Sequence, residues 1–245
     1  MNHGAPIKSE RTVLTIAHRG ASAHFPENTI AAFAAAIRAG ADMCELDVQK
    51  TVDGALVVIH DDTVDRTSDG RGRVDMLTLA AIRRLDAGRW CGDQFAGEGI
   101  PTLAEVFDLT AGQCGLNIEL KGEGVVEQLC GLICARAADR TAMVSSFDWA
   151  ELESVRRINP AIRLGLLADR APARLIDAAA RLKAWSINPE RKLIKPELCA
   201  TAHRRGLQVY VWTVDDPDEM RRMISAGVDG IMTNHPERLR AVLES

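Results

Sequence analysis

The sequence predicts an α/β protein that folds as one (β/α)8 barrel, the TIM-barrel architecture, and three observations support this prediction. The chain has 245 residues, and single barrels of this kind are typically about 250 residues long. Hydrophobic residues make up 47% of the chain, which is enough to bury a full core. Short β-type runs alternate with helical patterns, as parallel strands joined by helices do. We therefore expect residues 1–245 to form a single domain.

The expected barrel strands are short, mostly apolar runs. They lie at 13–18, 43–48, 115–120, 142–147, 162–167, 184–187, 207–212 and 229–233. Most of them start about 20 to 30 residues after the one before, which leaves room for one helix in each connection. One interval, between the starts at 43 and 115, is far longer and must hold additional structure.

Helix boundaries are marked by capping residues. Residues 29–40 place apolar side chains on one helical face and end at Gly40, a typical C-terminal stop signal. Three N-cap candidates, Thr102, Asp148 and Asp216, each stand three residues before a glutamate, which is the spacing of a capping box. These patterns place helices directly after the strands that they follow.

The long interval begins with a hairpin. Asp53 and Gly54 are a strong two-residue turn signal between apolar runs. Residues 55–60 should therefore return antiparallel beside the second strand rather than join the barrel. A two-residue turn pairs the strands so that Asp47 lies opposite His60, and a slip of one residue would turn the side chains to opposite faces.

A polar insertion follows the hairpin. Residues 61–100 are rich in glycine and aspartate and are long enough to form a lid or side wall. The stretch 77–86 within them has the pattern of a short helix.

Charged and titratable residues stand where the early strands end. Because the carboxyl ends of parallel barrel strands meet at one face, these side chains should lie close together. They are His18, Arg19, Glu45, Asp47, His60, Glu119 and Lys121.

Three of these side chains, those of Glu45, Asp47 and Glu119, are carboxylates that would repel one another at one rim. One bound divalent cation removes that conflict, and an all-oxygen ligand set suits Mg²⁺ or Ca²⁺ better than Zn²⁺. The alternative is that the carboxylates form ordinary ion pairs with Arg19 or Lys121.

The cationic side chains and imidazoles indicate chemistry on a phosphate. His18 and His60 flank the acidic cluster and can divide general-acid and general-base roles. Arg19 and Lys121 can hold a phosphate group. This combination favours cleavage of a P–O bond. The remaining histidines are interpreted as structural or surface residues; they are His3, His24, His203 and His235.

Charge and cysteine usage exclude several classes of protein. The net charge of −4 argues against a general nucleic-acid binder. The chain has no apolar run of the length of a transmembrane helix, so we expect no stable membrane insertion. The first ten residues lack a signal-peptide pattern, and the six cysteines form no CxxC pair, so we expect free thiols and a cytoplasmic location. The exposed helices of a barrel could form a homodimer interface, so the sequence leaves the oligomeric state open.

The sequence resembles the glycerophosphodiester phosphodiesterase family, most closely its short soluble bacterial members. The resemblance runs in order across almost the whole chain, and its specificity exceeds that of any single motif. The matching stretches are "AHRGAS", "PENT", "ELDVQ", "VVIHDDTVDRTSDGRG", "IPTLAEV", "IELK", "SSFD", "VWTVD" and "DGIMTNHP".

The resemblance implies a barrel of the kind that phosphatidylinositol-specific phospholipases C also use. It implies hydrolysis of a small-molecule glycerophosphodiester, such as glycerophosphocholine or glycerophosphoethanolamine, to sn-glycerol 3-phosphate and an alcohol. Carried over by motif, the three carboxylates are the ligands of one divalent cation, His18 and His60 are the acid–base pair, and Arg19 and Lys121 bind phosphate.

Other positions that match the family's motifs have less certain roles. Phe147 and Trp212 fall where aromatic side chains line the family's substrate pocket, although ordinary packing at the rim is the alternative. Glu27 and Asn28 either orient groups of the site or start the first helix, and for Asn28 we favour the helix start.

The chain departs from the family pattern at two positions. One is Asp215, where asparagine is frequent, and the other is His24. We expect neither to belong to the catalytic machinery, but a contact between His24 and substrate stays open.

Three rival functions remain at this point. A lysophospholipase D would use the same residues on lipid phosphodiesters and would need an apolar entrance. An aldolase or enolising barrel enzyme would use carboxylates and histidine on a carbonyl substrate. A non-catalytic phosphodiester-binding protein would bind the substrate without releasing an alcohol.

Overall fold

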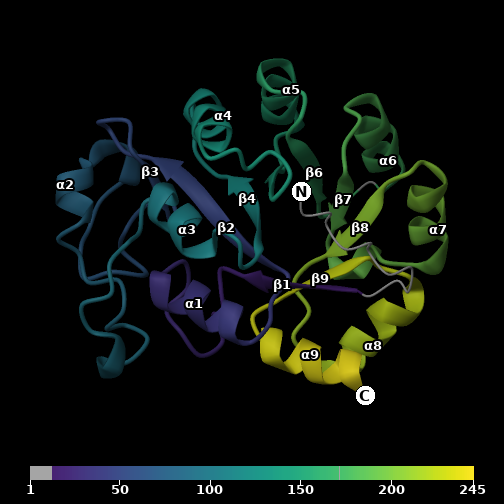
Figure 1. Cartoon of the computed structure of the whole chain (residues 1–245), viewed down its shortest axis with the longest axis horizontal. Coiled ribbons are helices and arrows are strands. Elements are labelled where there is room, and N and C mark those ends of the chain that lie inside the picture. Colours follow the sequence, from purple (N-terminus) through teal and green to yellow (C-terminus); the bar gives the residue numbers. More distant parts are fainter. Residues whose placement is uncertain (1–12, 171) are drawn as a thin grey trace, which may run out of the picture.

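The computed structural model describes residues 13–170 and 172–245, and it shows a closed parallel barrel surrounded by helices (Figure 1). The strands are hydrogen-bonded in the order β1-β9-β8-β7-β6-β5-β4-β2-β3, and an additional pairing of β1 with β2 closes the ring. All pairs around the ring are parallel, and only β3 is antiparallel. The predicted fold class is therefore confirmed.

The eight barrel strands coincide closely with the expected runs. They are β1 (Leu14–His18), β2 (Met43–Lys50), β4 (Gly115–Leu120), β5 (Ala142–Ser146), β6 (Arg163–Ala168), β7 (Ser186–Pro189), β8 (Gln208–Val211) and β9 (Gly230–Thr233). The largest difference is at β7, which begins two residues later than the run predicted at 184–187.

Helices follow the strands and cover the outside of the barrel (Figure 1). They are α1 (Ile30–Arg38), α3 (Leu103–Thr110), α4 (Val126–Ala135), α5 (Trp149–Ile158), α6 (Pro172–Arg181), α7 (Pro196–Arg204), α8 (Pro217–Ala226) and α9 (Pro236–Glu244). The predicted stop after α1 is confirmed, because Gly40 has a left-handed φ of 77°.

The three predicted N-caps are confirmed, but only one is a full capping box. Thr102 accepts a hydrogen bond from the backbone N–H of Glu105, whose side chain accepts one from Thr102 in return. The side chains of Asp148 and Asp216 cap α5 and α8, but their own backbone N–H groups do not donate to a glutamate side chain in return.

The hairpin after β2 is confirmed, but its register is not the predicted one. Strand β3 (Leu56–Val58) pairs with β2 so that Lys50 lies opposite Leu56, and the backbone N–H of Ile59 donates to the carbonyl of Asp47. Asp47 therefore lies opposite Ile59 and not opposite His60. The loop holds three residues instead of two, because the pairing closes at Thr51 with Ala55 and leaves Gly54 to take a left-handed φ of 86°.

His60 still reaches the barrel mouth because the chain leaves the strand before that residue. The side-chain amide of Gln49 donates to the carbonyls of His60 and Asp61, over 3.2 and 2.5 Å, and holds the bend. The hairpin lies above the barrel, since β3 pairs with the last residues of β2 and β1 pairs with the first.

The insertion has a small hydrophobic core of its own. It contains a single short α-helix, α2 (Leu79–Ile82), inside the predicted stretch 77–86, and the 3-10 turns η1 (Val74–Met76) and η2 (Asp93–Phe95). Its buried side chains pack against Val57 and Ile59 of the hairpin, in a cluster separate from the barrel core; they are Val64, Val74, Ile82, Ala87 and Ile100. The insertion thus forms a wall beside β3 and α3 (Figure 1).

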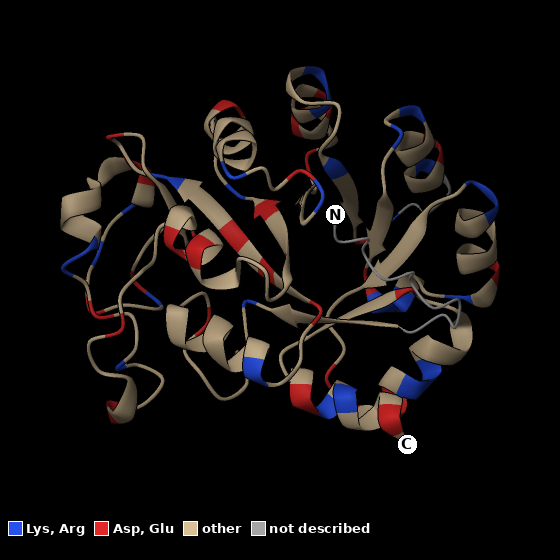
Figure 2. Ribbon diagram, in the orientation of Figure 1, with Lys and Arg blue, Asp and Glu red and all other residues tan. Residues whose placement is uncertain are grey.

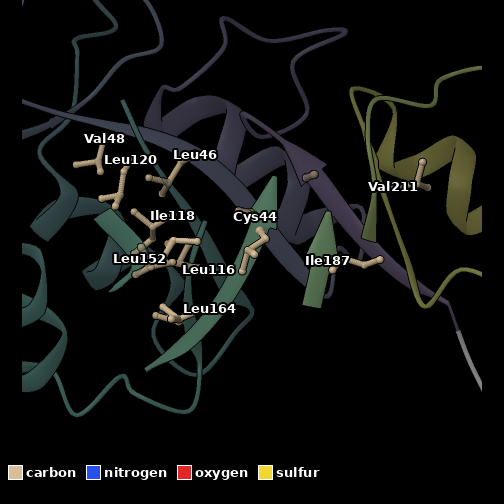
Figure 3. Packing of buried hydrophobic residues seen from close by; sticks show 14 of the residues in the cluster. Cys44, Leu46, Val48, Leu116, Ile118, Leu120, Leu152, Leu164, Ile187 and Val211 are labelled. Carbon is tan, nitrogen blue, oxygen red and sulfur yellow. The ribbon is translucent and has the colours of Figure 1, made fainter. Parts of the chain in front are cut away.

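Side chains alternate between the two faces of the barrel strands. Figure 3 shows the outward series, in which Cys44, Leu46 and Val48 of β2 pack beside Leu116, Ile118 and Leu120 of β4 in the core under the helices. The intervening residues of the two strands therefore face the barrel interior. This alternation explains how two apolar strands carry polar side chains to one enclosed site.

Among the described residues no helix is long and apolar enough to cross a bilayer. The six cysteines are free thiols, as expected. Cys130 is buried in α4, whereas Cys134 is exposed.

Candidate active site

Strand register brings the predicted carboxylates together at the carboxyl end of the barrel. His18 of β1 lies beside Glu45 of β2, and Asp47 of β2 lies beside Glu119 of β4. Acidic segments mark both β2 and β4 in Figure 2. One ligand oxygen from each of the three carboxylates lies within 4.8 Å of the others, and all three side chains are buried.

The buried carboxylates are under strong electrostatic strain. Burial, reinforced by the charge of Asp47, raises the pKa of Glu45 to about 8 and that of Glu119 to about 7. The two nearby cations compensate in part. Lys121 Nζ lies 2.6 Å from Glu119 Oε1, and Arg19 Nε lies 3.2 Å from Asp47 Oδ2.

The geometry of the cluster fits a hard divalent cation. Glu45 Oε1 and Asp47 Oδ1 are buried and accept no hydrogen bond, which is costly for a carboxylate unless another positive group is present. The cluster offers oxygen ligands only, as Mg²⁺ and Ca²⁺ prefer. Arg19 and Lys121 pair with the cluster as well, and Lys121 Nζ lies 3.6 Å from Asp47 Oδ1. The ion-pair alternative therefore accounts for part of the site, but it leaves Glu45 Oε1 buried without a hydrogen bond.

His18 is held by a neutral amide. Its Nδ1 lies 2.7 Å from Oδ1 of Asn234, the residue after β9. The oxygen and nitrogen of the Asn234 amide cannot exchange places without breaking a hydrogen bond, because Nδ2 donates to Asp215 over 2.7 Å. The proton of neutral His18 therefore sits on Nδ1, and Nε2 carries the free lone pair. Burial and the charge of Arg19 lower the pKa of His18, although the bond to Asn234 opposes this.

His60 is held by a carboxylate. Its Nδ1 lies 2.6 Å from Asp61 Oδ1. Arg66 of the insertion donates to the other oxygen of Asp61 over 2.6 Å, and it also donates to both oxygens of Glu27. The hydrogen bond from Arg66 holds the pKa of Asp61 well below its usual range, so Asp61 stays charged opposite the imidazole.

Arg19 is fixed by a second set of contacts. Its Nη1 donates to Glu27 over 2.8 Å, and its backbone N–H donates to Glu45 Oε2 over 3.0 Å. Burial alone would raise the pKa of Glu27, but the hydrogen bonds from Arg66 and Arg19 outweigh burial and hold it at about 2. Arg66 and Arg19 thus both donate to Glu27, whose lowered pKa keeps the carboxylate charged.

The helix-start interpretation of Asn28 is wrong. Thr29 is the N-cap of α1, and its side chain accepts from the N–H of Ala32. Asn28 has a left-handed φ of 59° and donates from Nδ2 to Asp47 Oδ2 over 2.9 Å. It therefore orients a carboxylate of the cluster, which is the alternative that its motif left open.

A cavity of about 270 Å³ joins these groups. Every predicted site residue lines it except Asp47; the lining includes His18, Arg19, Glu45, His60, Glu119, Lys121, Phe147 and Trp212. Phe147 and Trp212 form an edge-to-face pair with ring centroids 5.5 Å apart, and Phe147 is 46% exposed. The aromatic pair therefore forms an accessible apolar part of the cavity wall.

A larger cavity, of about 440 Å³, lies at the opposite end of β4 and is lined by residues such as Phe107, Thr110, Cys114 and Leu116. Its lining is mainly apolar and lacks the paired carboxylates and imidazoles. The chemistry of the described residues is concentrated at the carboxyl ends of the strands, where barrel active sites form.

Sequence reasoning missed the residues that hold the two imidazoles. Asp215 was expected to lie off the machinery, but it accepts from both the backbone and the side chain of Asn234 and so fixes the partner of His18. Arg66 was passed over although it stands inside a matching motif. Both residues act through a second side chain, and membership of the stretches "VWTVD" and "VVIHDDTVDRTSDGRG" was the only local signal.

Comparison with known proteins agrees with this geometry. The profile of the Glycerophosphoryl diester phosphodiesterase family matches residues 18–238. A glycerophosphodiester phosphodiesterase of Caldanaerobacter subterraneus is 46% identical over 232 residues, which cover 92% of this chain and 96% of the relative. A protein of the same name from Bacillus subtilis is 33% identical, covering 96% of this chain and 88% of the relative.

Solved structures agree as well. An Oleispira antarctica phosphodiesterase in complex with the product sn-glycerol-3-phosphate has a TM-score of 0.87 at 28% identity and covers 94% of this chain and 96% of its own. An Agrobacterium tumefaciens glycerophosphodiester phosphodiesterase has a TM-score of 0.85 at 30% identity, covering 94% and 99%. The chain belongs to the glycerophosphoryl diester phosphodiesterase family and is an enzyme of that class.

Proposed function

We propose that this enzyme hydrolyses small glycerophosphodiesters, such as glycerophosphocholine and glycerophosphoethanolamine, to sn-glycerol 3-phosphate and an alcohol, with one divalent cation, Mg²⁺ or Ca²⁺. One observation carries the proposal. Two imidazoles with different partners, a carboxylate cluster and two cations all meet around one cavity of about 270 Å³. The product complex of the Oleispira relative supports the choice of product.

Glu45, Asp47 and Glu119 would hold the cation, since they offer buried oxygens in an all-oxygen set. A bound cation supplies Lewis-acid stabilisation of the negative charge that develops on the phosphate oxygens. It also stabilises the ionised forms of the carboxylates, whose repulsion is otherwise relieved by proton uptake.

Arg19 and Lys121 would bind the phosphate group from one side of the cavity. Both are anchored by carboxylates and therefore need no ordering when substrate arrives. Phe147 and Trp212 would pack against the carbon atoms of the glycerol or alcohol portion. The small cavity favours a short head group over a lipid chain, which argues against a lysophospholipase D.

His18 would act as the general base. Its Nδ1 proton is committed to Asn234, so Nε2 faces the cavity with a free lone pair. Its lowered pKa keeps that lone pair available near neutral pH. Nε2 would take the proton from the nucleophile as the new P–O bond forms.

His60 would act as the general acid. The carboxylate of Asp61 lies at its Nδ1 and orients the ring, and the acid form of the ring would donate a proton from Nε2. That proton would pass to the leaving alcohol oxygen as the old P–O bond breaks. The proton taken by His18 and the proton given by His60 balance in each turnover.

Two nucleophiles fit this arrangement. Water would give sn-glycerol 3-phosphate directly, whereas a hydroxyl of the substrate's own glycerol would form a cyclic phosphate that water then opens. Trapping a cyclic glycerol phosphate in a rapid-quench reaction identifies the second route, and a single turnover that forms sn-glycerol 3-phosphate with no cyclic phosphate identifies the first.

The reaction is tested by incubating the protein with glycerophosphocholine and following both products by phosphorus NMR and a choline assay. We expect choline and sn-glycerol 3-phosphate in equal amounts, loss of the reaction with EDTA, and recovery with Mg²⁺ or Ca²⁺ added separately. Binding without choline release would instead show a binding protein, and full turnover in EDTA would remove the metal from the proposal.

We retain a cytoplasmic location and a possible homodimer as predictions. Six free thiols among the described residues support a reducing compartment. Fractionation of the native cells and sedimentation of the purified protein test these two predictions.

A further inference from the structure

A second group of metal-ligating side chains lies outside the carboxylate cluster. His24 stands in the loop after β1, His235 is the N-cap residue of α9, and Glu237 is in the first turn of that helix. One potential ligand atom from each side chain lies within 4.8 Å of the other two. Neither histidine lines the active-site cavity.

The spacing of these atoms is that of a metal coordination sphere. His24 Nε2 lies 3.4 Å from Glu237 Oε1, and His235 Nδ1 lies 3.2 Å from the same oxygen. A tetrahedral ion with ligand bonds of about 2.0–2.1 Å separates neighbouring ligand atoms by about 3.3–3.4 Å. The two imidazole rings meet edge to face, with centroids 5.2 Å apart, so they approach without stacking. The contact between His235 and Glu237 is a hydrogen bond in the metal-free protein, and an ion would take the place of its proton.

The donor set selects a different ion from the one at the carboxylates. Two imidazole nitrogens and one carboxylate oxygen form a set that Zn²⁺ and its neighbours in the first transition series accept, whereas Mg²⁺ and Ca²⁺ prefer oxygen alone. His24 is 59% and Glu237 46% exposed at the side chain, so an ion can enter from solvent and keep water as a further ligand.

We propose that His24, His235 and Glu237 form a second metal site, specific for a borderline transition ion such as Zn²⁺ and separate from the carboxylate site. The proposal rests on these three residues and does not depend on the proposed reaction.

An ion at this site would join two segments that support His18. The backbone N–H of Ala23 donates to the carbonyl of Asn234, and the side chain of Asn234 holds His18. Because the ligands come from both segments, Zn²⁺ that binds only the folded chain raises the melting temperature. The second site would therefore brace the part of the rim that carries the partner of His18.

The test titrates the whole protein, first saturated with Ca²⁺, with Zn²⁺ by calorimetry. Co²⁺ serves as a spectroscopic probe, because a tetrahedral Co²⁺ site absorbs visible light strongly. We expect one Zn²⁺ per chain and a rise in melting temperature, with Ca²⁺ retained. His24→Ala and His235→Ala should each weaken Zn²⁺ binding by about 10- to 100-fold and abolish the Co²⁺ band.

Two control variants separate this site from the others. His203→Ala removes a histidine that binds Asp229 at another part of the barrel and should leave Zn²⁺ binding unchanged. Glu45→Gln, in the carboxylate cluster, should leave the Co²⁺ band in place. The proposal is overturned if the wild-type protein takes up no Zn²⁺ beside Ca²⁺, or if the His24 and His235 variants bind it as tightly as wild type. Each variant's melting temperature without Zn²⁺ shows that it is folded.

Discussion

His18 and His60 face the same cavity, but their surroundings differ in charge. His18 donates from Nδ1 to the neutral amide of Asn234, whereas His60 meets the carboxylate of Asp61. The proposed mechanism assigns the base role to the ring with the neutral partner and the acid role to the ring that contacts a carboxylate.

The two histidines also differ in what supports them. The partner of His18 belongs to the barrel, since Asn234 follows β9 and is fixed by Asp215. The partner of His60 depends on the insertion, since Asp61 is fixed by Arg66. In the proposed mechanism, the barrel thus supports the base and the insertion supports the acid. The following predictions test that difference.

The largest effects are expected from removing the rings themselves. His18→Ala and His60→Ala should each lower kcat by about 10²- to 10⁴-fold on glycerophosphocholine, because each ring moves one proton in the transition state. Circular dichroism and melting curves check folding, and His203→Ala serves as the matched control.

The leaving group separates the two variants. A substrate that releases p-nitrophenol, a far better leaving group than choline, needs no protonation and should restore most of the activity of His60→Ala. It should not restore His18→Ala. Rescue of His18→Ala alone would reverse the assignment of acid and base.

Asp61→Asn should lower activity by about 10- to 100-fold, the effect of losing one hydrogen bond to a charged group. Steady-state kinetics on glycerophosphocholine check this loss, and the p-nitrophenyl substrate should reduce it, because a good leaving group does not depend on a well-oriented acid. A kcat equal to that of wild type on glycerophosphocholine would contradict a role of Asp61 in holding His60.

Arg66→Ala should lower kcat/KM by about 3- to 10-fold, because Arg66 touches neither substrate nor metal and acts by positioning Asp61 and Glu27. Arg71→Ala is the matched control, since Arg71 belongs to the same insertion, is 88% exposed and pairs with Asp65 at 3.4 Å. The p-nitrophenyl substrate should reduce the effect of Arg66→Ala. Equal activities of the two arginine variants on glycerophosphocholine would contradict a positioning role.

The smallest effect is expected in the melting temperature, and it depends on the buried carboxylates of Glu45 and Glu119. In the metal-free protein Glu45 and Glu119 keep their protons to about pH 8 and 7, whereas in the unfolded chain they lose them near pH 4.5. Between these values the folded state binds more protons, so its stability falls as pH rises. The melting temperature should therefore drop by a few degrees from about pH 5 to pH 8.

Added Ca²⁺ should reverse that drop, because the ion binds the ionised carboxylates and displaces their protons. Proton release measured by calorimetry in two buffers checks the same linkage. Glu45→Gln should flatten the pH dependence of the melting temperature, while the exposed Glu237→Gln should not. A metal-free melting temperature that rises toward pH 8 would contradict the raised pKa values.

Local patterns were sufficient for the barrel and for the residues at its mouth. Glu45 and Asp47 were recognised as neighbours on one face because side chains of a strand alternate with a period of two. Glu119 joined them because parallel strands of one barrel end at one rim. These regularities repeat along the backbone, so they are visible in the order of residues alone.

Tertiary structure decided what each ring contacts. His18 finds its acceptor 216 residues away, at Asn234, and Arg66 reaches Glu27 across 39 residues. The hairpin register also depended on one further loop residue, Val52, which the turn signal did not reveal. Hydrogen bonds require donor and acceptor to meet within a few tenths of an ångström, and no local pattern specifies positions that finely between segments far apart in the chain. The sequence alone therefore determined which residues gather at the mouth of the barrel, and only the folded chain decided which imidazole has a neutral partner and which a charged one.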